Sequence, residues 1–480
     1  MDNKYEVSII LIVYKTLEWI ESCIRSIESQ TFDNYELIII SNDDDIEIER
    51  TILKLTRGKS NVRYIHNTIN VGGAEACNQG MCEAKGKYVF FMDSDDELPP
   101  RALENLINKA DANDLDIVIG RGQILRNGKI RNVDYVPDWI SWEQEIIVGS
   151  VSEAPMLTFN PYYWGRLYRR EMLLDHNITM LPGAINADRN FNCKALLAAK
   201  SIGVCTQESY YWRKHNDDHY TSVTKGRMQQ QNFLDRIRMM QETDELFKSA
   251  GNSSLYECSK ICGLMRLLIL AGDIEKDESF KELYYQEMTR YMEAFSDDEI
   301  SECEYLTYRV KTLYYLLKNE RFEDFERFAE KKVGRTSTDT GDRTIYEYFD
   351  MDIPVDFRTQ YRFKIPIVTA RKKIEESTVV VNASAEMWDD CEPIITGISV
   401  KEKSTKQEVM RILPLDAHTD VGKLSVCFTI NNTELAERLS DNETYYFVVY
   451  YIIHSRVGKT KLTRRNGKTL HLKLEDISKE

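Results

Sequence analysis

The stretch K-Y-V-F-F-M-D-S-D-D-E-L-P-P, residues 87–100, joins an apolar run to a cluster of carboxylates. Residues 88–91 are aromatic or β-branched, which predicts a buried strand. The acids that follow repel one another; they are Asp93, Asp95, Asp96 and Glu97. A divalent cation, bound through oxygen ligands, would relieve this repulsion, whereas an isolated D-x-D is more often a polar loop that closes a strand. The flanking sequence decides between these interpretations.

Strand and helix patterns alternate on both sides of this stretch. Apolar runs predict strands at 7–14, 35–40, 62–66, 88–92 and 116–120, and helical spacing predicts helices at 18–30, 47–56, 74–85 and 102–112. The short connections predict an α/β domain with a largely parallel sheet and right-handed crossovers. Ligands of such sheets bind at the carboxyl ends of the strands. The residues expected to converge there are Tyr14, Asn42, Asn70 and Asp93.

Composition limits the class of protein. The chain has 480 residues, which predicts two or three domains, and its net charge of −15 argues against general affinity for nucleic acid. No apolar stretch reaches the roughly 18 residues of a transmembrane helix, and the apolar run near the start is interpreted as a strand rather than a signal peptide. Ten cysteines without C-x-x-C pairs predict reduced thiols and a cytoplasmic protein, with peripheral association at the inner face of the membrane left open.

Three domains are expected from the changes of pattern along the chain. Residues 1–227 form the α/β domain, residues 228–335 show helical spacing and predict a helical module, and residues 345–480 alternate as short strands do. The last segment predicts an all-β, immunoglobulin-like sandwich. The Gly-, Ser- and Thr-rich run G-R-T-S-T-D-T-G-D-R at 334–343 is interpreted as a linker.

Several motifs in the first 225 residues carry a family resemblance. They are V-S-I-I-L-I-V-Y-K at 7–15, S-I-E-S-Q-T-F-D-N-Y-E-L-I-I-I at 26–40, N-V-G-G-A-E-A-C-N-Q-G at 70–80, D-S-D at 93–95, W-G-R-L-Y-R-R-E at 164–171 and A-D-R-N-F at 187–191. In order and spacing these resemble the family-2 inverting glycosyltransferases with the GT-A (nucleotide-diphospho-sugar transferase) fold. With the helices and β-strands that follow, the architecture resembles wall teichoic acid glycosyltransferases, which add N-acetylglucosamine to poly(ribitol phosphate) and trimerise.

The resemblance implies a UDP-sugar donor site and a base. The donor site comprises Val13, Tyr14, Asn42, Asn70, Gly73, Asn78, Asp93, Ser94 and Asp95, with Mn²⁺ or Mg²⁺ on Asp95. A metal there would neutralise the charge that develops on the leaving diphosphate. Asp188 is implied as the base that activates the acceptor hydroxyl, although A-D-R-N-F also suits a helix N-cap aspartate.

Four further residues are assigned to the acceptor or the diphosphate, each with an alternative. One of the two residues Arg213 and His215 would reach the diphosphate; alternatively, both lie on a surface strand. Trp164 would stack on a sugar, or belong to the core. Arg166 would bind acceptor phosphates, or sit at a solvated helix start. Asp96 and Glu97 are expected to cap the turn into the helix that follows Pro99 and Pro100, because negative charge is favoured there.

The predicted activity is transfer of a sugar, N-acetylglucosamine by resemblance, to a hydroxyl of an anionic cell-wall glycopolymer. The alternatives are transfer to lipid-linked capsular or exopolysaccharide intermediates, and a degenerate carbohydrate-binding protein. Ile12, Cys77 and Ala187 depart from the family pattern and leave the last alternative open. The basic stretch 456–468 is interpreted as a hairpin that protects a sheet edge or as a contact with a polyphosphate polymer, and a homotrimer through the C-terminal domain is expected by resemblance.

Overall fold

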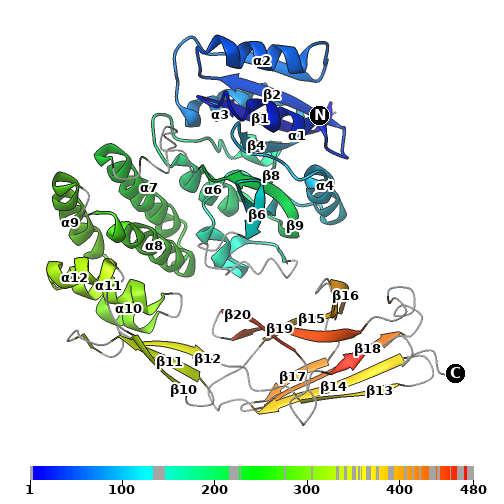
Figure 1. Ribbon diagram of the computed structural model, residues 1–480, viewed down its shortest axis with the longest axis vertical. Helices are drawn as coiled ribbons and strands as arrows, with labels where there is room; N and C mark the ends of the chain where they lie inside the picture. Colours follow the sequence, from blue (N-terminus) through cyan, green and yellow to red (C-terminus); the bar gives the residue numbers. More distant parts are fainter. Residues whose placement is uncertain are drawn as a thin grey trace. The chain divides into compact units, whose positions relative to one another are not determined.

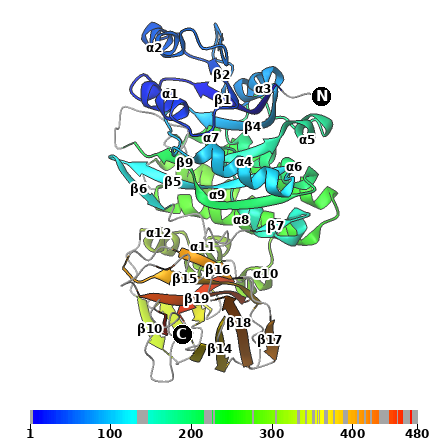
Figure 2. The ribbon, with the colours of Figure 1, turned by 90° about the vertical axis from the view of Figure 1, so that its right-hand side faces the viewer.

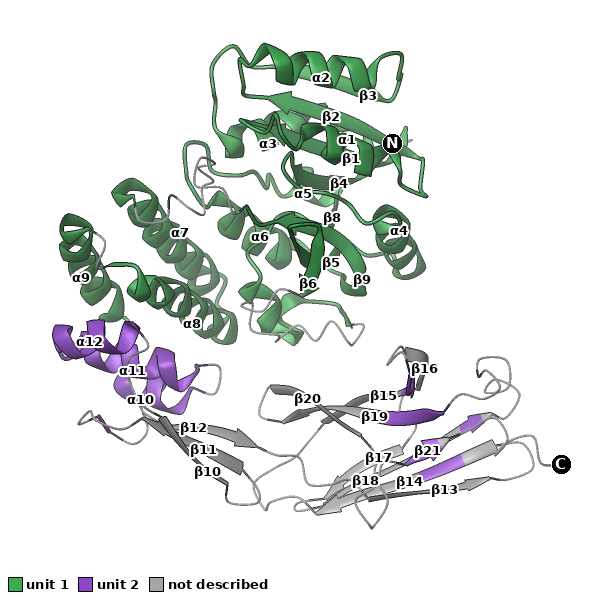
Figure 3. Cartoon of the chain, in the orientation of Figure 1, with its two compact units in different colours: residues 1–294 green, residues 295–480 purple. Residues whose placement is uncertain are grey.

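The computed structural model of the chain (Figure 1) describes most of the first 330 residues and the strands that follow them. The described residues are 4–132, 146–215, 226, 229–274, 277–303, 306–330, 335–339, 343–348, 353–354, 357, 359–363, 369–374, 378–386, 394–404, 408–412, 416–420, 423–431, 439, 444–453, 456–461 and 470–472. The chain divides into two compact units, residues 1–294 and residues 295–480, which Figure 3 shows in different colours.

A mixed sheet forms the centre of the first unit. Its strands are β1 (Tyr5–Val13), β2 (Tyr35–Ser41), β3 (Val62–His66), β4 (Gly86–Asp93), β5 (Ile117–Arg126), β6 (Lys129–Asn132), β7 (Ile147–Val148), β8 (Arg166–Arg169) and β9 (Ile202–Arg213). The order is β3-β2-β1-β4-β8-β5-β9-β7, with β6 paired to β5. Strands β1 to β4 are parallel, and β8 lies antiparallel between β4 and β5. The predicted alternation of strands and helices is confirmed, and the expected largely parallel sheet is modified by β6, β7 and β8.

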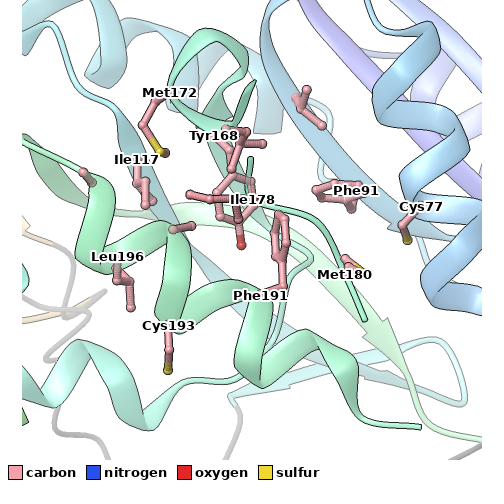
Figure 4. Packing of buried hydrophobic residues seen from close by; sticks show 14 of the residues in the cluster. Cys77, Phe91, Ile117, Tyr168, Met172, Ile178, Met180, Phe191, Cys193 and Leu196 are labelled. Carbon is pink, nitrogen blue, oxygen red and sulfur yellow. The ribbon is translucent and has the colours of Figure 1, made fainter. Parts of the chain in front are cut away.

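Both faces of this sheet are buried, as expected of a parallel sheet between helices. Along β1, Ile9 and Leu11 pack with α1 (Ile20–Glu28), α2 (Ile46–Thr56) and α4 (Ala102–Asn113). Ile10 and Ile12 point to the other face, toward α3 (Gly73–Glu83) and α6 (Ala187–Ala198). Figure 4 shows part of this second face, where Phe91 of β4 meets Phe191 of α6. The period of two along each strand therefore sets two cores.

Helices continue the first unit beyond the sheet. They include α5 (Arg170–Asp175), α7 (Gln230–Ser249), α8 (Ser253–Leu268) and α9 (Glu278–Met292), with the 3-10 turns η1 (Val151–Glu153), η2 (Pro155–Phe159) and η4 (Ile269–Gly272). Helix α7 packs on α6 and α8, and α8 packs on η2. Figure 2 shows these helices of the first unit from a second direction. The described residues between 229 and 330 are mostly helical, and the boundary between the two units falls within this range; a separate helical module 228–335 stays a prediction.

The second unit contains the remaining helices and the antiparallel sheets. Its helices are α10 (Asp297–Glu302), α11 (Tyr308–Lys318) and α12 (Phe322–Ala329). Its strands are β10 (Arg335–Asp339), β11 (Arg343–Tyr348), β12 (Thr359–Phe363), β13 (Thr369–Ile374), β14 (Thr378–Glu386), β15 (Ile394–Glu402), β16 (Glu408–Ile412), β17 (Asp416–Asp420), β18 (Lys423–Asn431), β19 (Tyr445–Ile453), β20 (Arg456–Lys461) and β21 (His471–Leu472).

These strands form three antiparallel sheets, β10-β11-β12, β13-β14-β18-β17 and β16-β15-β19-β20, with β21 paired to β19. The described residues after 345 lie mostly in β-strands, and the all-β, immunoglobulin-like sandwich stays a prediction. The run interpreted as a linker contains strand β10, which pairs with β11. Of the basic stretch 456–468, residues 456–461 form β20 beside β19, and residues 462–468 lie outside the described residues.

The close approach of β1 and β4 depends on Gly86. A Cβ atom at this position would lie 2.6 Å from the backbone nitrogen of Ser8 and 2.7 Å from the carbonyl carbon of Val7. We expect Gly86→Ala to lower the free energy of unfolding by about 1–3 kcal/mol, because the backbone must move to relieve the contact. Chemical denaturation of the variant measures this loss. Gly73→Ala is the matched control, since a Cβ there meets nothing within 4 Å; equal stability of the two variants would contradict the prediction.

Candidate active site

The carboxyl ends of β1, β2 and β4 are tied together by short polar contacts. The backbone N–H of Asn42 donates to the carbonyl of Val13 at 2.9 Å, and that of Ser94 donates to the carbonyl of Ile12 at 3.2 Å. The Asp43 carboxylate accepts from the backbone N–H of Lys15. The three strand ends therefore form one edge, as the sequence predicted from the parallel arrangement.

The glycine turn before α3 lies at this edge. Gly72 has φ +85°, a backbone conformation that favours glycine, and its N–H donates to the Asn70 side chain at 2.8 Å. A Cβ on Gly73 would meet open space. The N-terminus of the eleven-residue helix α3 is therefore exposed, with open space beside its first residue, Gly73. Such a terminus favours anionic groups.

Some predicted donor-site residues use their side chains for the fold. Val13 is fully buried, and its carbonyl accepts from the backbone N–H of Asn42, whereas Tyr14 is 43% exposed. The Asn42 amide donates to the Gly72 carbonyl at 3.4 Å. Asn78 exchanges two hydrogen bonds of 2.9 Å with the backbone of Met180, which fixes the segment before α6 to α3.

Asp93 ends β4 in a strongly acidic environment. Burial and the charge of Asp95 raise the pKa of Asp93 to about 7, although the hydroxyl of Tyr163 donates a hydrogen bond to its Oδ1. The charge of Asp188 raises this pKa further. Burial, first, and then the charges of Asp93 and Asp188 raise the pKa of the buried Cys77 thiol. The charges of Asp93 and Asp188 therefore both reach the Cys77 thiol.

Asp96 is a structural residue of this loop. It is 1% exposed and accepts hydrogen bonds of 2.7 Å from the Tyr210 hydroxyl and from the backbone N–H of Arg213. The Tyr210 hydroxyl also accepts from the backbone N–H of Asp93 at 3.1 Å. The prediction that Asp96 caps the following helix is wrong, because its carboxylate is turned inward to β9.

Arg213 and His215 lie over the D-S-D segment. The Arg213 Nε donates to the Asp95 carbonyl at 2.7 Å, and its Nη2 forms an ion pair with Glu97. The Nε2 of His215 lies 2.7 Å from Oδ2 of Asp95, and its ring lies 4.1 Å from the ring of Trp19. These contacts place both side chains at the predicted donor site. The alternative that both residues lie on a surface strand does not fit, because Arg213 bonds to the acidic loop.

Asp188 lies in the first turn of α6. The helix begins at Ala187 with Asn186 at the N-cap position, so the interpretation of Asp188 as the N-cap residue is wrong. Burial raises the pKa of Asp188, and its hydrogen bond from the backbone N–H of Arg189 opposes this rise. The positive charges of Arg266, Arg236 and Arg189 also oppose it. A partly shielded carboxylate near a second acidic centre has the properties of a general base.

Trp164 and Arg166 are buried. Trp164 is 7% exposed and stacks on Tyr162 and Tyr210, with ring centroids 4.5 and 4.6 Å apart. The core interpretation therefore fits Trp164. Arg166 is 1% exposed, lies in β8 and donates to the Asn160 carbonyl at 2.7 Å. The interpretation of Arg166 as a solvated helix start is wrong, because the segment is a strand in the interior.

The acidic loop has the chemistry that a divalent cation needs, in part. Burial and then the charge of Asp95 raise the pKa of Asp93, and a cation bound at these carboxylates would favour the ionised form of Asp93. Within the described part of the chain, no group of three His, Cys, Asp or Glu side chains is arranged to hold a metal ion. Mg²⁺ is commonly held by one or two carboxylates together with substrate phosphates. The residues therefore fit a metal that binds together with a diphosphate.

Two tyrosines of the site were not predicted from the sequence. Tyr163 bonds to Asp93, and Tyr210 bridges the backbone of Asp93 and the carboxylate of Asp96. Both belong to aromatic runs, P-Y-Y-W-G and S-Y-Y-W-R, which resemble core sequence. Only the position of each hydroxyl in the fold identifies its role.

Comparison with known proteins gives the class. Residues 8–173 match the family model described as Glycosyl transferase family 2. S. aureus TarS has the same fold, with a TM-score of 0.51 at 14% identity over 95% of this chain and 77% of TarS. A structure of TarS 1–349 in complex with UDP-GlcNAc gives a TM-score of 0.53 at 16% identity, over 75% and 99% of the two chains. The prediction of a family-2 domain with the GT-A fold is confirmed.

Curated relatives are similar over part of their length. The poly(ribitol-phosphate) β-glucosyltransferase of Bacillus spizizenii is 31% identical over 45% of this chain and 34% of its own. The poly(ribitol-phosphate) β-N-acetylglucosaminyltransferase TarP of Staphylococcus aureus is 26% identical over 61% of this chain and 87% of its own. The putative glycosyltransferase EpsH of Bacillus subtilis is 28% identical over 44% of this chain and 61% of its own. The chain thus spans less than two thirds of EpsH and of the B. spizizenii enzyme.

No helix in the described segments is long and apolar enough to span a membrane.

The raised pKa of Asp93 predicts a pH dependence of stability in the metal-free protein. The carboxyl ionises at about pH 7 when folded and near pH 4 when unfolded. Its contribution to stability is therefore complete below about pH 4 and is lost as the pH rises to about 7. We expect Asp93→Asn to remove this part of the decline, measured by denaturant unfolding between pH 4 and 8 without divalent cations.

The matched control is Asp277→Asn, which changes an exposed aspartate at the N-cap of α9. It should leave the decline between pH 4 and 7 as in the parent protein. A decline that is the same in Asp93→Asn and the parent would contradict the assignment.

Proposed function

We propose that the protein is an inverting glycosyltransferase that moves a sugar, N-acetylglucosamine, from its UDP conjugate to a hydroxyl of a wall-teichoic-acid-like polymer. The observation that carries the proposal is that the end of β4, which bears Asp93, packs on the start of α6, which bears Asp188: the ring centroids of Phe91 and Phe191 lie 5.6 Å apart. The charge of Asp188 also raises the pKa of Asp93, after burial and the charge of Asp95. A donor-handling carboxylate and a base must lie on one site for a single displacement. The similarity to two poly(ribitol-phosphate) glycosyltransferases supports the acceptor, and the TarS complex with UDP-GlcNAc supports the donor.

In the proposed reaction, Asp188 accepts the proton of the acceptor hydroxyl while the hydroxyl oxygen attacks the anomeric carbon. The bond from this carbon to the UDP oxygen breaks, and UDP leaves with the negative charge. Burial raises the pKa of Asp188, which makes it a stronger proton acceptor than an exposed aspartate. Mn²⁺ or Mg²⁺ bound at Asp95 would neutralise charge on the leaving diphosphate.

The side chains of Arg213 and His215, over the acidic loop, have a role in the same step. Both contact Asp95 and the loop around it, so the Arg213 guanidinium and the His215 ring lie beside the proposed diphosphate position. Interactions that strengthen as the leaving group gains charge accelerate the reaction. Asp95, Arg213 and His215 would then form one unit that handles the diphosphate.

The test is UDP release and polymer glycosylation with a panel of UDP-sugars, Mn²⁺ and poly(ribitol phosphate). We expect turnover with UDP-N-acetylglucosamine, and a loss of about 10²- to 10⁴-fold in kcat for Asp188→Asn, the range of a general base. UDP binding, measured by calorimetry, should be unchanged in Asp188→Asn, because the base does not hold the donor. Asp95→Asn should instead lose the metal-dependent part of UDP binding.

Asp277→Asn serves as the control, since it changes an exposed aspartate at a helix N-cap in the same unit. Turnover near the parent level in Asp188→Asn would contradict the base assignment. UDP binding without turnover on any donor would favour the carbohydrate-binding alternative, and turnover only with lipid-linked acceptors would replace the polymer.

A further inference from the structure

The helix that carries Asp188 is attached to the fold on two sides. On the sheet side, Phe191 packs against Phe91 and Tyr168, with ring centroids 5.6 and 5.3 Å apart (Figure 4). On the other side, α6 packs on α7, which packs on α8. Apolar packing holds a helix on a surface and leaves some freedom of rotation and sliding. The polar contacts of Arg189 add directional restraint.

Arg189 directly follows Asp188 and is 1% exposed. Its Nη2 donates to the Oγ and the carbonyl of Ser259 in α8, at 3.0 and 3.2 Å. Its Nη1 donates to the Thr158 carbonyl of η2 at 3.4 Å and lies 3.2 Å from the Cys262 sulfur. The guanidinium therefore connects the first turn of α6 to α8 and η2.

Asp244 of α7 supplies the opposite charge through Ser259. The Oγ of Ser259 donates to Asp244 Oδ1 at 2.6 Å, and the Tyr291 hydroxyl of α9 lies 3.3 Å from Oδ2. Asp244 is 8% exposed, and burial raises its pKa to about 6, whereas the hydrogen bond from Ser259 and the charge of Arg189 oppose this rise. Opposite charges joined through a buried hydroxyl in this way add little to stability compared with apolar packing. Their place beside the proposed base points to a role in the site.

The segment that Arg189 contacts also leads to the donor carboxylate. Four consecutive carbonyls, of residues 158–161, accept side-chain hydrogen bonds from Arg189, Arg266, Arg166 and Asn192. Two residues later, Tyr163 donates to Asp93. One clamped stretch of backbone thus joins the Asp188 helix to the carboxylate at the end of β4.

We propose that Arg189 is a positioning residue for Asp188, and that the pair Asp244–Ser259 on α7 and α8 holds Arg189 in place. The proposal rests on the proposed function, because it takes Asp188 as the base. The helices after the GT-A sheet then serve the reaction: they fix the first turn of α6 relative to the D-S-D loop. A displacement of about 1 Å in such a site costs on the order of 10²-fold in rate.

Asp244→Asn and Arg189→Met test the proposal, the first because it removes the charge with little change of shape. We expect Asp244→Asn to lower kcat about tenfold or more while the KM for the UDP-sugar stays within about twofold, since the donor contacts lie elsewhere. The backbone amides of residues 189–192 should also exchange hydrogen faster, measured by mass spectrometry. Arg189→Met should lose more, and Arg189→Lys should recover part of kcat.

Tyr291→Phe and Tyr284→Phe form a matched pair of controls in α9. Tyr291 contacts Asp244, whereas the Tyr284 hydroxyl, also buried, donates to the Leu267 carbonyl at 3.1 Å and lies outside the network. We expect Tyr291→Phe to lower kcat more than Tyr284→Phe at a similar loss of Tm. Equal kcat in the two, or an Asp244→Asn kcat equal to that of Tyr284→Phe, would overturn the proposal.

The outcome for Asp188→Asn separates this inference from the proposed function. If Asp188→Asn is inactive and Asp244→Asn turns over like the parent, only the positioning role is wrong. If Asp188→Asn keeps its activity, the base assignment is wrong and the positioning inference fails with it.

Discussion

The interaction on which the site depends is the burial of an acidic loop against the end of β9. Strands β4 and β9 are separated in the sheet by β8 and β5, yet the loop after β4 pairs with β9 at Glu97 and Tyr211. Asp96 receives its two hydrogen bonds from β9, through Tyr210 and the Arg213 backbone. Burial and then the charges of Asp95 and Asp93 raise the pKa of the Asp96 carboxyl well above its usual range, and these two hydrogen bonds oppose the rise. The same contacts hold Asp93 and Asp95 at the strand end.

A second constraint links this loop to the helices. Tyr163 joins Asp93 to the backbone stretch that carries the clamped carbonyls, and that stretch contacts α6 and α8. Burial raises the pKa of the Tyr163 hydroxyl, and the charges of Asp93 and Asp188 raise it further. The two acidic centres are therefore mechanically and electrostatically connected. A substitution of either carboxylate, Asp93 or Asp188, should therefore affect the other.

The sequence predicted the fold of the first unit closely where periodicity is strong. The strands 62–66 and 35–40 and the helix 102–112 lie within one residue of the observed elements, because buried strands and amphipathic helices have distinct periods. Strand β8 was missed, since R-L-Y-R is four residues long and two of them are charged. The division of the chain at residue 294 could not be read from the helical spacing, which is continuous across it.

The candidate site was predicted in part. Motif spacing identified Asp93, Asp95 and Asp188, and the structure relates them by charge. Motif spacing could not distinguish a carboxylate of the proposed donor site from a carboxylate that is buried in the protein, as Asp96 is. Both kinds occur side by side in one acidic run of the sequence. Long-range contacts such as Arg189 to Ser259 leave no local pattern in the sequence.

The stereochemistry of the product tests the central claim most directly. A single displacement assisted by one base, Asp188, inverts the anomeric carbon, and the sugar of UDP-N-acetylglucosamine is α-linked. NMR of the glycosylated acceptor should therefore show a β linkage. An α-linked product would contradict the account, because retention requires a step that the proposed base cannot perform.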